Sequence, residues 1–346
     1  MFSSKNPYQI LAVLGIVIAM SYIAPKIKQS FETNDEYELI KKYLLNDSPL
    51  YGFNKPKLWI HSKYEVNSRK WKSFQSRNST DMNQPYIHLT IKTIINHCGD
   101  DFNICLIDDE TFSKLIPSWD IDLTTVAEPH KSHYRHIGML QLIYYYGGML
   151  VPNSFLCLKN LKSLYDTGIA NGMPFVCENV NRSVNVAKEN YKRLFMPDIT
   201  MMGAPKNSQS IKEFIEYLKK NEQTGHFSSE PDFLGKASHW LMDEIIIQKM
   251  ELVGGELIGV KSQKRKPILL ENLMEEEFLD LSPSVYGIYI PADELLRRTK
   301  YQWFAVMPAE ELLHTSPIIV KYLKASIVDS TNEYHKSTEI PSVVAI

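Results

Sequence analysis

The segment from Ile143 to Ser154, with the sequence IYYYGGMLVPNS, joins the end of a helical pattern to a short apolar run through two glycines. Apolar residues recur at helical spacing up to this point, and Gly147 stands where helices commonly end in a left-handed residue. Residues 149–151 then form an apolar run that is typical of a buried strand. Short strand patterns and helical patterns alternate in the same way over residues 55 to 205. The sequence therefore predicts an α/β fold with a mostly parallel central sheet.

This segment resembles the helix, Gly-Gly, strand, Asp-x-Asp element of the DxD-type glycosyltransferases. That superfamily includes the yeast outer-chain mannosyltransferases and the bacterial capsular polysaccharide sugar transferases. The resemblance implies a GT-A-like single domain in which Gly147, Gly148 and the residues after the strand contact a nucleotide-sugar. In those enzymes the aspartates hold a divalent cation against the diphosphate of the donor.

Pro152 and Ser154 occupy the positions of the two aspartates in this sequence. Magnesium and manganese prefer carboxylates and other hard oxygen ligands. The side chain of Pro152 has no such oxygen, and Asn153 and Ser154 offer only neutral oxygens. We therefore expect no metal cofactor at this site, and we expect Asn153 to contact the nucleotide-sugar.

The start of the same helix carries the sequence His133-Tyr134-Arg135-His136. The family usually has an aspartate and, three residues later, an arginine that grip the nucleotide-sugar, and these positions fall on His136 and Met139. Transferases without a metal stabilise the leaving diphosphate with cations, and arginine donates two hydrogen bonds to a phosphate at once. This favours Arg135 as the diphosphate contact, with His133 and His136 as secondary candidates. The alternative is an ordinary solvated first turn of a helix.

Two further segments follow the order of elements in the same family. Lys55 to His61 resembles its first strand, after which an aromatic ring meets the nucleotide base. Trp59 is therefore a candidate base contact, and simple packing in the core is the alternative. Asn103 to Asp109 has the pattern of a buried strand that ends in two acids, where α/β folds place ligand contacts. Asp108 is a candidate acidic ligand, and helix capping is the alternative.

After about residue 205 the resemblance is too weak to transfer any residue. Apolar positions predict an amphipathic helix over 208–220 and a second one around 237–245. Asp232 and Asp243, before and on the second helix, are alternative acidic ligands, although helix acids are commonly only solvated. Strand signals occur at 267–270, 286–290 and 303–306. These elements extend one glycosyltransferase-like domain over residues 55–325, and a polar tail follows over residues 326–346.

The N-terminus carries an apolar run over residues 8–24 that is flanked by lysines. About 17 apolar residues are the shortest helix that spans a bilayer. We predict a single-pass transmembrane anchor over 8–24 and a stalk over 25–54, with a cleavable signal peptide as the alternative. Asn46, Asn78 and Asn181 each begin an Asn-x-Ser/Thr triplet. The order of anchor, stalk and domain, with these triplets, places the bulk of the chain in a lumenal or extracellular compartment.

The composition is that of a globular protein of 346 residues, with 44% hydrophobic residues and a formal net charge of −2. Acidic and basic residues are interspersed, which argues against nucleic acid as a partner. The four cysteines lack the spacing of a metal site. Cys98 with Cys105, or Cys157 with Cys177, are pairings that an oxidising compartment would permit.

Three functions are compatible with these features. The first is a membrane-anchored glycosyltransferase that moves a sugar from a nucleotide donor to a glycan or protein acceptor without the usual metal. The second is a catalytically inactive relative that keeps the fold and serves as a binding or structural membrane protein. The third is an unrelated membrane-associated interaction protein with a chance Gly-Gly match. Loss of the metal carboxylates raises the reaction barrier unless other groups compensate.

Overall fold

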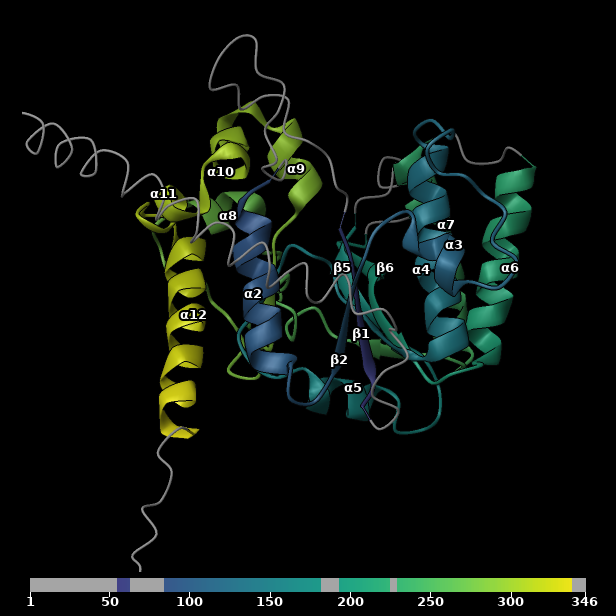
Figure 1. The fold of residues 1–346 in the computed structure, drawn as a ribbon, viewed down its shortest axis with the longest axis horizontal. Coiled ribbons are helices and arrows are strands. Elements are labelled where there is room, and N and C mark those ends of the chain that lie inside the picture. The colour runs from purple at the N-terminus through teal and green to yellow at the C-terminus, as the bar shows by residue number, and fades with distance from the viewer. Residues whose placement is uncertain (1–54, 63–83, 182–192, 225–228, 338–346) are drawn as a thin grey trace, which may run out of the picture. The chain divides into compact units, whose positions relative to one another are not determined.

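The computed structural model describes residues 55–62, 84–181, 193–224 and 229–337 (Figure 1). All of them belong to one compact unit, Leu50–Ile346. The predicted anchor over 8–24 and the stalk over 25–54 lie outside the described residues. Within the described ranges, no helix is both long and apolar enough to cross a membrane.

The centre of this unit is a six-stranded sheet with the strand order β2-β1-β3-β6-β5-β7. Its strands are β1 (Lys57–His61), β2 (Asn103–Ile107), β3 (Gly148–Leu150), β5 (Phe175–Val180), β6 (Phe195–Ala204) and β7 (Glu251–Val253). β1 pairs in parallel with β2 and β3, and β5 pairs in parallel with β7, whereas β6 runs antiparallel to both of its neighbours. The predicted mixed α/β architecture with a mostly parallel sheet is confirmed. A second sheet pairs β4 (Phe155–Cys157) with β8 (Gly287–Tyr289).

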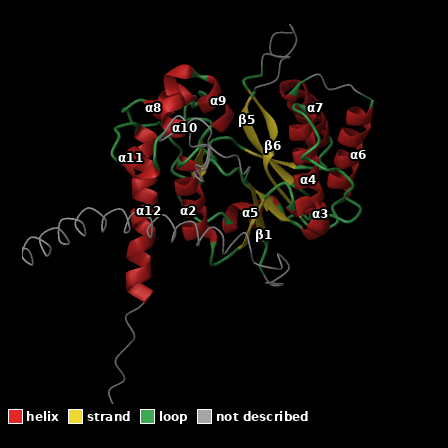
Figure 2. Cartoon of the chain, turned by 45° about the horizontal axis from the view of Figure 1, so that its top comes forward, coloured by secondary structure: helices red, strands yellow, loops and turns green. Residues whose placement is uncertain are grey.

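Helices lie on both sides of the central sheet (Figures 1 and 2). One side carries α4 (His130–Tyr146), α6 (Gln209–Gln223) and α7 (Glu230–Ile246), of which α4 and α7 pack directly on β6. The predicted amphipathic helix over 208–220 is α6, and the second predicted helix is α7. The remaining helices are α2 (Tyr86–Cys98), α3 (Thr111–Leu115), α5 (Lys162–Gly168), α8 (Leu270–Met274), α9 (Ala292–Arg297), α10 (Gln302–Val306), α11 (Ala309–Leu313) and α12 (Ile318–Ser337).

The junction between α4 and β3 has the predicted form of a helix, a glycine pair and a buried strand. The N–H of Gly147 donates to the carbonyl of Ile143 at 2.7 Å and closes the helix, with φ at 69°. Gly148 has φ at 103° and begins β3, whose residues are all buried. A Cβ atom on Gly148 would lie 2.1 Å from the backbone oxygen of Lys57 in β1. The glycine pair therefore allows α4 to lead directly into the middle of the sheet.

Two predicted strands in the C-terminal part are wrong. Residues 303–306 lie in α10, and Leu270 begins α8 instead of ending a strand. Apolar runs of four residues fit a buried strand and a short buried helix equally well, so their pattern could not separate the two. The strand signal at 286–290 is confirmed by β8. Helix α12 continues to Ser337, within the segment assigned to the polar tail.

All four cysteines are buried free thiols. The Sγ atoms of Cys98 in α2 and Cys157 in β4 lie 3.8 Å apart. This contact brings together two cysteines that the sequence analysis placed in different candidate pairs. The two cysteines are in contact because α2 and β4 pack together in the fold. The spacing of the cysteines along the chain does not predict this contact.

Candidate functional site

A cavity of about 250 Å³ opens where β1 and β3 reach their carboxyl ends. Its wall includes His61 after β1 and the segment Leu150–Ser154 that continues β3. Helix α4 contributes polar side chains on one side, and the region around β8 and α9 closes the other. Ligand sites of parallel α/β sheets occupy this edge because the strand ends and the following loops converge there.

Backbone hydrogen bonds fix the segment that follows β3. The N–H of Val151 donates to the carbonyl of Trp59 at 3.0 Å, and the N–H of Phe155 donates to the carbonyl of Pro152 at 3.0 Å. The hydroxyl of Thr90 donates to the carbonyl of Asn153 at 2.6 Å. These hydrogen bonds therefore fix the segment from Val151 to Phe155 at the cavity.

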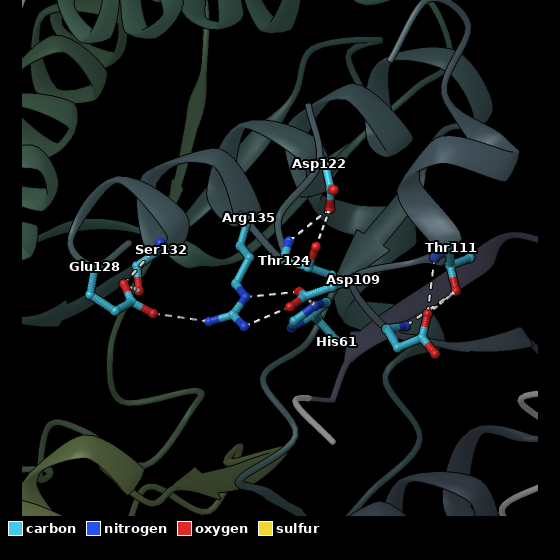
Figure 3. A network of polar contacts seen from close by, with 9 residues as sticks. His61, Asp109, Thr111, Asp122, Thr124, Glu128, Ser132 and Arg135 are labelled. Carbon is cyan, nitrogen blue, oxygen red and sulfur yellow. Dashed lines mark hydrogen bonds and ion pairs between the residues drawn. The ribbon is translucent and has the colours of Figure 1, made fainter. Parts of the chain in front are cut away.

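Arg135 of α4 reaches the cavity wall, but carboxylates already engage its guanidinium (Figure 3). Nε and Nη2 donate to the two carboxylate oxygens of Asp109 at 2.8 and 2.6 Å. Nη1 donates to Glu128 at 3.2 Å, and the Arg135 side chain is 8% exposed. This bidentate geometry is the strongest that an arginine makes with a carboxylate. A phosphate that approaches Arg135 must compete with both acids.

Asp109 is the centre of this network. His61 Nε2 lies 3.0 Å from its Oδ1, and the His61 ring stacks on Phe112 at 5.5 Å between centroids. Burial alone would raise the pKa of Asp109, but the hydrogen bonds from His61 and Arg135 outweigh it and hold the pKa well below the usual range. Asp109 is therefore a permanent anion at neutral pH.

Glu128 supports the start of α4. One of its oxygens accepts from the Ser132 backbone N–H at 3.1 Å and from the Ser132 hydroxyl at 2.7 Å. A carboxylate at this place satisfies a free helix N–H and offsets the positive end of the helix dipole. Ser132 itself lines the cavity. The Asp109–Arg135–Glu128 network thus fixes α4 relative to the end of β2.

Two acids also line the cavity. Glu230, in the first turn of α7, lies 3.9 Å from Nε2 of His136 and 3.9 Å from Arg297. Asp293 of α9 also lines the cavity. The lining of the cavity therefore combines Arg135, two imidazoles and these two acids, and one of the imidazoles already contacts Glu230. This lining suits a polar ligand with hydroxyl groups, and leucine, isoleucine and methionine side chains supply its apolar part.

The structure places only some of the predicted site residues at the cavity. Arg135, His136 and Asn153 line it. The other predicted residues do not: Trp59, Gly147, Gly148, Asp108, Asp232 and Asp243.

Trp59 is fully buried, and its Nε1 donates to the carbonyl of Gly147 at 2.9 Å. Its role as a base contact is corrected to packing, which was the alternative. Gly147 and Gly148 act through the backbone of the α4–β3 junction.

The three predicted acidic ligands make local contacts instead. Asp108 accepts from the N–H of Thr111 at 2.9 Å at the start of α3, so the capping alternative describes it. Asp232 pairs with Lys236 at 3.2 Å on the surface of α7, and Asp243 is exposed on the same helix. The buried His133 lies with its ring against Phe233 at 4.4 Å between centroids, away from the cavity.

Sequence reasoning missed Asp109, Glu230 and Asp293 as site residues. Asp293 follows β8, and the rule that ligands gather at strand ends would have pointed to it. Asp109 follows the predicted ligand Asp108 directly at the end of β2. The two acids differ in the direction of their side chains, which the sequence does not show. The sequence around Glu230 indicates only that this residue lies in the first turn of a helix, so no pattern marks it as a site residue.

The cavity residues do not fit the divalent metal of the DxD enzymes. Pro152 supplies no ligand atom, and the Ser154 hydroxyl is neutral and 2% exposed. Among the described residues, the group with metal-ligand geometry is His130, His133 and Glu222, and none of the three lines the cavity.

No protein-family model matches this chain, and no curated protein sequence matches it either. Solved structures of glycosyltransferases have a similar course of the backbone. The PaToxG glycosyltransferase is 15% identical with a TM-score of 0.34, over 64% of this chain and 81% of that one. The apo form of the glycosyltransferase GlyE from Streptococcus pneumoniae TIGR4 is 10% identical with a TM-score of 0.39, over 84% of this chain and 66% of that one.

The galactosyltransferase LgtC, solved with donor and acceptor sugar analogues, is 11% identical with a TM-score of 0.37, over 78% of this chain and 95% of that one. These identities and TM-scores are low, and no assignment of function rests on them.

Proposed function

We propose that this chain is a glycosyltransferase-like protein that binds a nucleotide-sugar in the cavity beside Asn153 without a metal ion. The observation that carries the proposal is the place of this cavity. It lies at the carboxyl ends of β1 and β3, against the segment where the sequence resembles the donor site of the DxD enzymes. Pro152 and Ser154 remove the metal ligands from that segment but leave the cavity open.

The cavity offers groups for each step of a sugar transfer. The Arg135 guanidinium and the His136 imidazole are the groups that could meet a donor diphosphate. Transfer breaks the bond between the sugar C1 and the diphosphate and forms a bond from C1 to an acceptor hydroxyl. The proton of that hydroxyl must pass to a base, and Glu230 and Asp293 are the carboxylates on the wall. The acceptor would be a glycan or a protein hydroxyl.

A bulky substitution at Asn153 tests the place of binding. Asn153→Trp is expected to weaken the binding of uridine or guanosine diphosphate at least tenfold, about 1.4 kcal/mol, because the indole occupies the cavity. Asn171→Trp adds the same bulk in an exposed turn and is the matched control. Isothermal titration of both variants measures the effect. Equal affinities in the two variants would place the binding elsewhere.

A catalytically inactive relative is the second candidate, and one observation favours it. Arg135 is held by Asp109 in bidentate geometry and by Glu128, so its charge is already compensated before a ligand arrives. A donor diphosphate would then gain little from it, and the barrier to transfer would stay high. Absence of diphosphate binding, with or without manganese, is the result expected from this candidate.

We also propose that residues 8–24 anchor the chain in a membrane as a single-pass helix, with the domain in the lumen or outside the cell. The support is the apolar run and its length. The expressed protein is expected to stay in the membrane pellet after carbonate extraction. Release into the soluble fraction with a new N-terminus near Tyr22 would show a cleaved signal peptide instead.

A further inference from the structure

Two histidines and a glutamate meet between α4 and α6, away from the cavity. His130 and His133 are three residues apart on α4, so they project from the same face of the helix. Nδ1 of His133 lies 2.9 Å from Oε2 of Glu222, and Nδ1 of His130 contacts Oε1 of the same carboxylate. One ligand atom from each residue lies within 4.8 Å of the other two. Three side chains that can bind a metal thus converge on one point.

The burial of this cluster is unequal. The side chains of His133 and Glu222 are 0% and 2% exposed, whereas that of His130 is 49% exposed. A buried carboxylate requires compensation of its charge, and both of its oxygens face imidazoles. A divalent cation would compensate the carboxylate fully.

We propose that His130, His133 and Glu222 bind a divalent transition-metal ion of the zinc class. Two imidazole nitrogens and one carboxylate oxygen form a ligand set found in zinc sites with an open position, and water completes the coordination. The exposed side of His130 leaves room for entry of the ion and for that water. Imidazole ligands select zinc, cobalt, nickel or copper over magnesium and calcium, which prefer oxygen.

Binding changes the protonation of the ligands in a defined way. Each Nδ1 that now contacts Glu222 must present a lone pair to the ion. Its proton moves to Nε2 of a neutral ring or leaves to solvent from a charged one. The carboxylate exchanges its imidazole contacts for the ion, and no group is oxidised or reduced.

The site would clamp the first turn of α4 to α6. The first two turns of α4 also carry Ser132 and Arg135, which line the cavity. The Phe233 ring lies 4.4 Å from the ring of His133 and 5.8 Å from that of His136, which also lines the cavity. The metal site is a proposal independent of nucleotide binding, since its residues lie outside the cavity.

Cobalt and zinc titrations of the untagged full chain test this site. Cobalt(II) is expected to bind with one ion per chain and to give visible absorption bands of nitrogen and oxygen ligation. Zinc is expected to displace it and to raise the melting temperature. His130→Ala removes a half-exposed ligand without loss of core packing, and it is expected to weaken cobalt binding at least tenfold. His314→Ala removes an exposed histidine elsewhere and is the matched control.

Glu222→Gln provides a second variant that keeps the volume of the buried side chain. It is expected to abolish the cobalt bands, and circular dichroism verifies that the variant is folded. Equal cobalt affinity in His130→Ala and His314→Ala would overturn the proposal. Absence of binding at millimolar cobalt would also overturn it. An intense near-ultraviolet charge-transfer band would assign the ion to cysteine thiolates, with the same consequence.

Discussion

Gly148→Ala is expected to lower the free energy of unfolding by about 3 to 5 kcal/mol, from backbone strain and a steric clash together. Gly148 has φ at 103°, where residues with a Cβ are strained. The added Cβ would lie 2.1 Å from the backbone oxygen of Lys57, which belongs to the parallel partner strand and cannot rotate away. Relief requires that β3 separates from β1. Urea denaturation followed by circular dichroism measures the loss.

Gly172→Ala is the matched control for this substitution. Gly172 also has a positive φ, at 71°, but a Cβ there meets no atom within 4 Å. The control isolates the backbone strain, which is about 1 to 2 kcal/mol for one residue. Similar losses in the two variants would mean that β3 does not pair closely with β1 at Gly148, contrary to the α4–β3 junction described above.

Asp109→Asn is expected to destabilise the protein by about 2 kcal/mol at pH 7, because it leaves the buried Arg135 without its bidentate partner. This value is below the range for fully buried ion pairs because Asp109 is 26% exposed and Glu128 still contacts the guanidinium. Asp166→Asn is the control, since Asp166 forms an exposed ion pair with Lys162. Its expected effect is less than about 1 kcal/mol.

The effect of Asp109→Asn is expected to depend on pH. The pKa of Asp109 is lower in the folded chain than in the unfolded one, where it is about 3.9. Its contribution is therefore fully present above the unfolded value and is lost as the pH falls toward the folded value. The stability difference between wild type and variant is therefore expected to shrink as the pH falls below about 4. A difference that grows below about pH 4 would contradict the assignment of Asp109 as the anion that holds Arg135.

The sequence was sufficient to predict the features that depend on neighbouring residues. Gly147 ends α4, and β3 follows as a buried strand. The sequence predicts both features because helix termination and strand burial each depend on a few adjacent residues. The helix over 208–220 is predicted for the same reason. Residues 303–306 show the limit, because an apolar run of four residues does not distinguish the helix α10 from a strand.

The site depends on contacts between distant residues, and these are set by topology. Arg135 lies at the cavity, but its partner Asp109 lies 26 residues earlier and faces it only once β2 and α4 pack together. Trp59 has the sequence context of a base contact, yet the sheet buries it. The cluster of His133 and Glu222 joins residues 89 positions apart, so no spacing rule could reveal it.

The most direct test of the central claim is a titration of the full chain with a nucleoside diphosphate, with and without manganese. The account predicts binding that changes less than about twofold on addition of the ion, because Pro152 and Ser154 supply no carboxylate. The same titration in His130→Ala removes any effect of an ion between α4 and α6. Binding that manganese strengthens tenfold or more, about 1.4 kcal/mol, would contradict the account, because another acid would then hold a metal at the cavity. Absence of binding in both conditions would contradict it as well.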